Sequence, residues 1–224
     1  MQNVVAIPAN PALVNSTEAF LRAVSQGGNG AEAFITMVDR LTDRMLGLFL
    51  LEPAERAQIS SGQRKVIDFA VSTASKASLM LTRQIYKKTS NAEFAPIVRN
   101  VEAMYWAAGD DNGQQAHISF PVDAAFADDF RRAADACLAG RGQDEVMLVT
   151  RVMDQLNDAI LDNVFVAQTR LVKIGFVTQK ALNVGVEGSR KAVRAVNGKV
   201  LRGLSNEELK LFMSHYGEII KQRG

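Results

Sequence analysis

Two histidines and one cysteine are the side chains of this sequence with the most distinctive chemistry. His215 precedes Glu218 by three residues in a helical pattern, a spacing that places two metal ligands on one helix face. Neither His117 nor His215 lies in the ExxH or HExxH patterns of di-iron and zincin sites. We interpret His215 and Glu218 as a partly exposed polar pair, and we expect no bound metal.

The acidic segment Asp110-Asp111-Asn112-Gly113 has some features of a calcium loop. With Gly113 at the sixth position of such a loop, Ala108 and Ser119 fall at the first and twelfth positions, where carboxylates are required. The pattern therefore fails, and a solvated turn is the better interpretation.

Catalytic patterns are also missing from the sequence. Cys137 has no histidine near it in the chain, and buried free cysteines usually behave as small hydrophobic residues. There is no GxSxG elbow. The segment from Gly185 to Lys191 lacks the Walker spacing and follows a helix, whereas a phosphate loop follows a strand. We expect a protein that is not an enzyme and needs no cofactor.

A basic segment, residues 190–202, is the strongest candidate binding element. It is predicted to form an amphipathic helix, with Val193, Val196 and Val200 on one side. Its basic residues are Arg190, Lys191, Arg194, Lys199 and Arg202. They can lie on an ordinary solvated surface, pair with acidic residues, or contact phosphate on nucleic acid or anionic lipid. Valine and alanine give little apolar area for membrane insertion, and no aromatic residue is interleaved for base stacking.

Charge is distributed unevenly, although the net charge is only +2. Residues 1–90 carry 10 basic and 7 acidic residues, residues 91–162 carry 5 and 13, and residues 163–224 carry 11 and 4. The acidic middle and the basic C-terminal part favour docking between opposite charges. An acidic protein surface, in this chain or in another, is therefore the preferred partner of the basic segment.

Hydrophobic periodicity is helical almost everywhere, and period-two alternation is nearly absent. We predict an all-α multi-helix bundle with little or no β structure, built around one long helix over about 144–184. Its first apolar stripe averages 3.5 residues, as in a coiled coil, and comprises Met153, Leu156, Ile160, Val164, Ala167, Leu171 and Ile174. A second stripe, Leu161, Phe165, Val172 and Phe176, is predicted to bind a partner. Gly185 and Gly188 are predicted to interrupt the helix.

The chain divides into three predicted parts. Residues 1–30 form an N-terminal arm with a short helix and a glycine-rich linker, which either packs elsewhere or belongs to the core, and residues 31–184 form the bundle core. Residues 185–224 form the basic helix and a capped C-terminal helix that packs on the bundle. We find no repeat period. No segment is typical of a signal peptide or a membrane span, which indicates a cytoplasmic protein.

These observations favour a non-enzymatic helical scaffold that self-associates or binds a protein partner through apolar helix faces and complementary charge. One alternative is binding of nucleic acid or an anionic surface through residues 190–202. The other is an enzyme with an unfamiliar all-helical site.

Overall fold

The computed structural model describes residues 1–108, 115–217 and 219–223, and its chain is mostly helical. The acidic segment from Asp110 to Gly113 and the predicted polar partner Glu218 lie outside the described residues. The first part of the chain contains β1 (Gln2–Pro8), α1 (Pro11–Ser25), α2 (Gly30–Leu46), a π-helical stretch η1 (Gly47–Leu51), α3 (Glu52–Arg56), α4 (Ser61–Tyr86), α5 (Asn91–Met104) and β2 (Tyr105–Ala108).

The second part begins with a strand and follows the same order of elements. It contains β3 (Gln115–Pro121), α6 (Ala124–Leu138), α7 (Val146–Ile160), a π-helical stretch η2 (Leu161–Val166), α8 (Ala167–Thr169), α9 (Phe176–Val200), a 3-10 turn η3 (Leu201–Gly203), α10 (Asn206–Ser214) and β4 (Ile220–Arg223).

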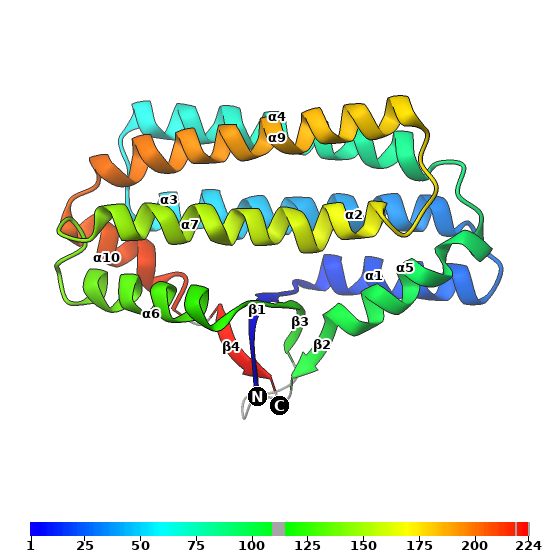
Figure 1. Cartoon of the computed structure of the whole chain (residues 1–224), viewed down its shortest axis with the longest axis horizontal. Coiled ribbons are helices and arrows are strands. Elements are labelled where there is room, and N and C mark those ends of the chain that lie inside the picture. The colour runs from blue at the N-terminus through cyan, green and yellow to red at the C-terminus, as the bar shows by residue number, and fades with distance from the viewer. Residues whose placement is uncertain (109–114, 218, 224) are drawn as a thin grey trace.

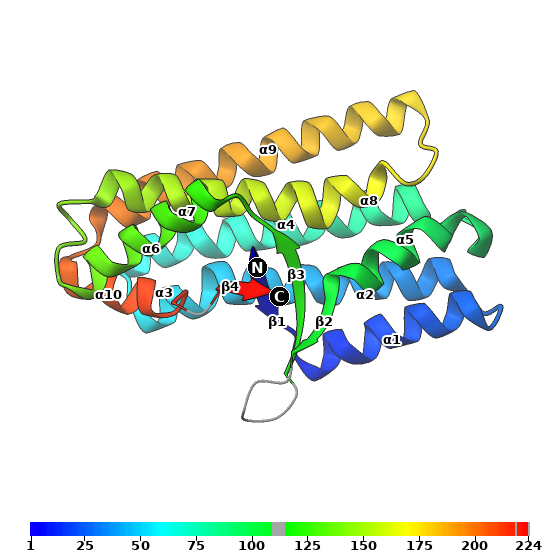
Figure 2. The ribbon, with the colours of Figure 1, turned by 60° about the horizontal axis from the view of Figure 1, so that its bottom comes forward.

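The helices form three layers, and a small sheet lies at the third layer, away from the first (Figure 1). Helices α4 and α9 form one outer layer, and α2 and α7 lie beneath them (Figure 1). The third layer consists of the pair α1 and α5 and the pair α6 and α10, with the sheet between the two pairs (Figures 1 and 2). The layers α4/α9 and α2/α7 together make a four-helix bundle, which positions the site described below.

The chain is mostly helical, as predicted, and its small amount of β structure forms one sheet. Its strand order is β2-β3-β1-β4, and every neighbouring pair is antiparallel. The buried run from Val4 to Ile7 lies in the central strand β1. The segment from His117 to Phe120 forms β3 and pairs with both β1 and β2. The pairings of β1 with β3 and β4 join residues more than 100 positions apart in sequence, so local periodicity gave no sign of them.

The two parts of the chain are structural repeats, although the sequence shows no repeat period. Strand β3 begins and ends 113 residues after β1, and β4 begins and ends 115 residues after β2. Ala6 lies directly opposite its equivalent, Ser119, in the central strand pair. The sheet is therefore related to itself by an approximate twofold axis between β1 and β3.

Turns and caps repeat in the same way. Gly27 and Gly140, which end α1 and α6, have φ angles of 76° and 75°. Ser90 and Ser205 both form capping boxes, at the starts of α5 and α10. The residues after them, Asn91 and Asn206, accept backbone N–H bonds from Gly30 and Gln143. Few side chains match between the halves, which explains why no period is visible in the sequence.

The predicted long helix over 144–184 is two separate helices. Helical structure runs from Val146 to Thr169, turns through residues 170–175, and resumes at Phe176. Gly185 and Gly188 do not interrupt α9, although each glycine costs about 1 kcal/mol of helix stability relative to alanine. A β-carbon at Gly185 would lie 2.9 Å from the Leu81 side chain, so this glycine permits close packing of α9 on α4.

The N-terminal residues 1–30, predicted to be an arm, belong to the packed body of the protein. Val5 and Ile7 of β1 and Leu13 of α1 are fully buried in the main hydrophobic core. Four residues of the first predicted stripe, Met153, Leu156, Ile160 and Val164, are buried within the chain on α7 and η2, whereas Leu171 of the same stripe is exposed.

Candidate ligand cavity and cationic surface

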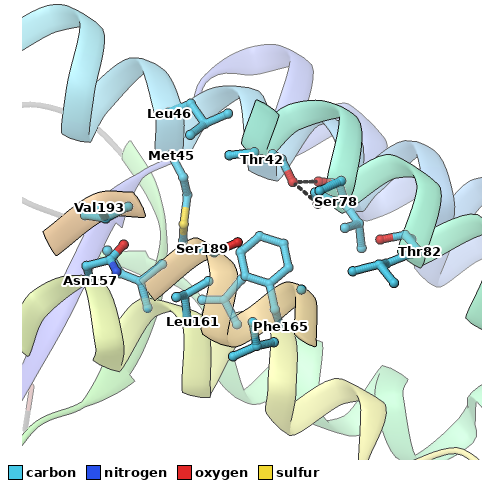
Figure 3. A pocket seen from close by; sticks show the side chains of 18 of the residues that line it. Thr42, Met45, Leu46, Ser78, Thr82, Asn157, Leu161, Phe165, Ser189 and Val193 are labelled. Carbon is cyan, nitrogen blue, oxygen red and sulfur yellow. Dashed lines mark hydrogen bonds between the residues drawn. The ribbon is translucent and has the colours of Figure 1, made fainter. Parts of the chain in front are cut away.

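The four-helix bundle contains a partly open cavity of about 170 Å³ between α2, α4, α7 and α9 (Figure 3). An apolar cavity of about 150 Å³ in another protein is large enough to bind benzene. Along α9 the lining residues extend from Leu182 to Asn197, a distance of about 22 Å at the usual helical rise. The cavity is therefore long and narrow.

Its lining is predominantly apolar, and it contains no acidic or basic side chain. The residues from α2 and η1 are Phe34, Val38, Thr42, Met45, Leu46, Phe49 and Leu50. Those from α4 are Ala74, Ala77, Ser78, Leu81, Thr82, Ile85 and Tyr86. The remainder come from residues 153–169 and from α9. Such a wall suits an uncharged ligand, because burying an unpaired charge is costly.

The cavity lies between the two halves of the repeat. Leu46 and Leu161 line it at positions 115 residues apart, and so do Thr42 and Asn157. Figure 3 shows these four side chains around the same space. The cavity is thus a product of packing one half against the other.

A few polar groups interrupt the apolar wall. The hydroxyl oxygens of Thr42 and Ser78 lie 2.9 Å apart and share a hydrogen bond (Figure 3). Three buried polar atoms of the lining residues have no hydrogen-bond partner among the described residues: the Tyr86 hydroxyl, Oε1 of Gln168 and Nδ2 of Asn157. Burial raises the pKa of Tyr86 well above its usual value, so the hydroxyl stays protonated and is a donor.

The predicted basic residues of 190–202 divide into two groups. Arg190 and Arg194 turn toward α7, where both pair with Asp158, at 3.4 and 2.5 Å. Arg190 also pairs with Asp162 at 2.5 Å. Lys191 and Lys199 are exposed, as is Arg202, which donates to the Met147 sulfur.

The four apolar residues that were predicted to bind a partner are not on one surface. Leu161 and Phe165 line the internal cavity (Figure 3). Val172 packs against the smaller core cluster. Phe176 begins α9 and is 84% exposed.

The residues considered for catalysis or metal binding lie in separate places. Cys137 is buried in α6, and its burial raises the pKa of the thiol to about 11. His215 is buried against η1, where Nε2 donates to the Leu48 carbonyl oxygen at 2.8 Å. His117 is buried in β3 with its Nε2 3.4 Å from the Lys221 amine. Within the described ranges, no group of three potential metal ligands occurs.

The cavity was not predicted from the sequence, although one of its walls left a signal. Ala74, Ala77 and Leu81 follow a helical stripe of α4, and small residues there allow a neighbouring helix to approach. The sequence did not indicate that a void would remain beside them, because this depends on the opposite walls from the second half.

Comparison of the chain with protein-family models, curated proteins and solved structures finds no match. Among the described helices, none is long and apolar enough to cross a membrane.

Proposed function

We propose that this protein is a non-enzymatic binding protein that holds an uncharged, chain-shaped apolar molecule, such as a long-chain alcohol, between its two halves. The observation that carries the proposal is the long uncharged cavity inside the bundle. Ligand sites are typically apolar with a few placed polar groups, and this cavity has that composition.

The polar atoms of the wall favour a neutral head group. The Tyr86 hydroxyl and the Asn157 amide can each donate a hydrogen bond, and Oε1 of Gln168 can accept one. An alcohol both donates and accepts. A carboxylate would be buried beside no cation, because the lining contains none, and this would cost several kcal/mol.

The outer layer gives the ligand a route into the cavity. In α4 the buried residues are only Ile67, Thr82 and Tyr86, whereas α7 buries seven of its residues. Elements with few buried contacts open at a smaller free-energy cost. Separation of α4 or α9 from the layer beneath is therefore the expected opening motion.

Fluorescence of N-phenyl-1-naphthylamine, which rises in apolar surroundings, tests the cavity. We expect the dye to bind the wild-type protein and 1-dodecanol to displace it at lower concentration than dodecanoate. Filling the cavity from either half, with Ala77→Leu or Ser189→Leu, should weaken dye binding by about tenfold, the loss of about 1.4 kcal/mol.

Ala125→Leu is the matched control, because Ala125 is exposed on α6 and outside the cavity. Thermal unfolding of all three variants separates loss of the cavity from loss of the fold. Equal dye binding by folded Ala77→Leu, Ser189→Leu and wild-type protein would refute the proposal.

Self-association, the function predicted from the sequence, is the second candidate. Phe176 at 84% exposure and Leu171 at 37% leave apolar surface where α8 turns into α9. Isolated apolar side chains on a surface are common, so the decisive measurement is light scattering after size exclusion. A dimer that Phe176→Ser converts to a monomer would support this candidate, whereas a monomer at all concentrations would exclude it.

A further inference from the structure

The outer sides of α4 and α9 form one continuous face of the protein. The two helices lie side by side at the edge of the molecule (Figure 1). They contain 26 and 25 residues, so each is about 38 Å long. No other described helix covers their outer side in Figure 1.

The exposed stripe of α4 combines basic and large apolar side chains. Its members lie three, four or seven residues apart, which keeps them on one side of a helix. They are Lys65, Phe69, Lys76, Met80, Arg83 and Lys87. Phe69 is 75% exposed and Met80 63%. Large apolar side chains are thus held in solvent between cations.

Helix α9 repeats this arrangement. Its exposed stripe comprises Val177, Lys180, Val184, Lys191 and Lys199. Val177 is 76% exposed and Val184 67%. Lys180, Val184 and Lys191 come 115 residues after Lys65, Phe69 and Lys76, so both halves present the same kind of stripe at equivalent positions.

The basic side chains of the two stripes have no ion pair with any residue that the structure describes. The acidic residues of α4 and α9 are Asp68 and Glu187. Asp68 pairs with Arg64, and Glu187 pairs with Arg190. The unpaired basic side chains of the two neighbouring helices repel one another. Such unpaired like charges are typical of a surface that binds an external anion.

We propose that the α4/α9 face docks on the surface of an anionic phospholipid bilayer. Lysine and arginine near the surface attract anionic head groups, and Phe69, Met80, Val177 and Val184 enter the boundary between head groups and acyl chains. Residues 190–202 alone have too little apolar area for this role. Helix α4 supplies the missing phenylalanine and methionine.

Co-sedimentation with vesicles tests the face and does not depend on the cavity. We expect the full chain to bind vesicles of phosphatidylcholine and phosphatidylglycerol in equal parts, and to bind pure phosphatidylcholine at least tenfold more weakly. The double variant Lys76→Glu/Lys191→Glu should lose at least tenfold in binding. Its control, Arg99→Glu/Lys210→Glu, makes the same charge change at exposed residues of α5 and α10 and should change binding less than twofold.

The apolar residues separate a lipid surface from other polyanions. Phe69→Ser/Met80→Ser should weaken binding to the mixed vesicles at least fivefold and leave retention on heparin unchanged. Circular dichroism checks that each variant is folded. Equal loss in the two charge variants, or binding of a DNA duplex or polyglutamate with no binding to the mixed vesicles, would overturn the proposal.

Discussion

At the residue scale, His215 makes the stability of the protein depend on pH. Burial lowers the pKa of this imidazole, and Arg56 and Arg44 act in the same direction. The bond to the Leu48 carbonyl and the charge of Glu52 oppose the shift. The neutral form is thus favoured in the folded state. The stability that the neutral imidazole contributes is present above its pKa in the unfolded state, about 6.5. It is lost as the pH falls through the lower pKa of the folded state.

We therefore predict that His215→Gln reduces the fall in unfolding free energy between about pH 7.5 and pH 5. Urea unfolding of the wild-type and His215→Gln proteins at the two pH values measures this fall in unfolding free energy. The wild-type curve includes the titration of other groups, so the relevant quantity is the difference between the proteins. An identical pH dependence in both would contradict the prediction.

A second residue-scale prediction concerns Arg190, which joins α9 to α7. Its side chain is 21% exposed and contacts Asp158, Asp162 and Glu187. Arg190→Gln leaves Asp158, 28% exposed, with one cation fewer. We expect a loss of about 1 kcal/mol of unfolding free energy, between the values for exposed and buried pairs. Lys191→Gln is the control on the same turn and should change stability by less than about 0.5 kcal/mol.

At the scale of elements, the repeat places equivalent asparagines at equivalent turns. Asn91 and Asn206 accept a backbone N–H from Gly30 and Gln143, at the turn between the first two helices of each half. Asn206→Ala should cost about 1 kcal/mol, the usual loss of one partly buried hydrogen bond, and Asn91→Ala should cost more, because its amide also donates to the Gly28 and Ala23 carbonyls. The sites lie in different helix pairs, so the double variant should be additive. Denaturant unfolding measures all three, and a strongly non-additive double variant would argue against independent halves.

The accuracy of the sequence-based prediction also varied between elements. The predominantly helical class and the capped C-terminal helix followed from local patterns, and the structure shows the helices and a capping box at Ser205. The sheet was missed because β1 and β3 pair across more than 100 residues. The long helix was wrong because the apolar pattern continues through residues 170–175, where the backbone turns. The uneven charge distribution favoured docking between opposite charges, and in the structure Arg190 and Arg194 pair with Asp158.

The cavity and the cationic face could not be predicted from any single segment of the sequence. Leu161 and Phe165 were read as a partner surface because their stripe is apolar, yet they line a cavity whose other walls are distant in sequence. The basic segment of α9 lacked bulky apolar residues, and these are on α4. Both features arise from the packing of two halves.

At the scale of the molecule, the twofold arrangement places the two chain ends together. Gln2 of β1 pairs with Arg223 of β4, so their Cα atoms are about 5 Å apart. In the repeat, this junction corresponds to the link between β2 and β3, where Ala108 pairs with Gln115. A short linker between the ends should therefore reproduce a connection that the fold already has.

We predict that a circular permutant with joined ends and new termini between Gly27 and Gly28 folds and keeps the cavity. This turn is exposed, and exposed turns tolerate new termini. Its unfolding free energy should stay within about 2 kcal/mol of wild type, since the permutation removes few contacts. Binding of the naphthylamine dye should change less than about threefold, below 1 kcal/mol. A permutant opened at Val152, which is fully buried in α7, should fail to fold and serves as the contrast. If both permutants fail equally, chain connectivity, and not the packing of two equivalent halves, determines the fold.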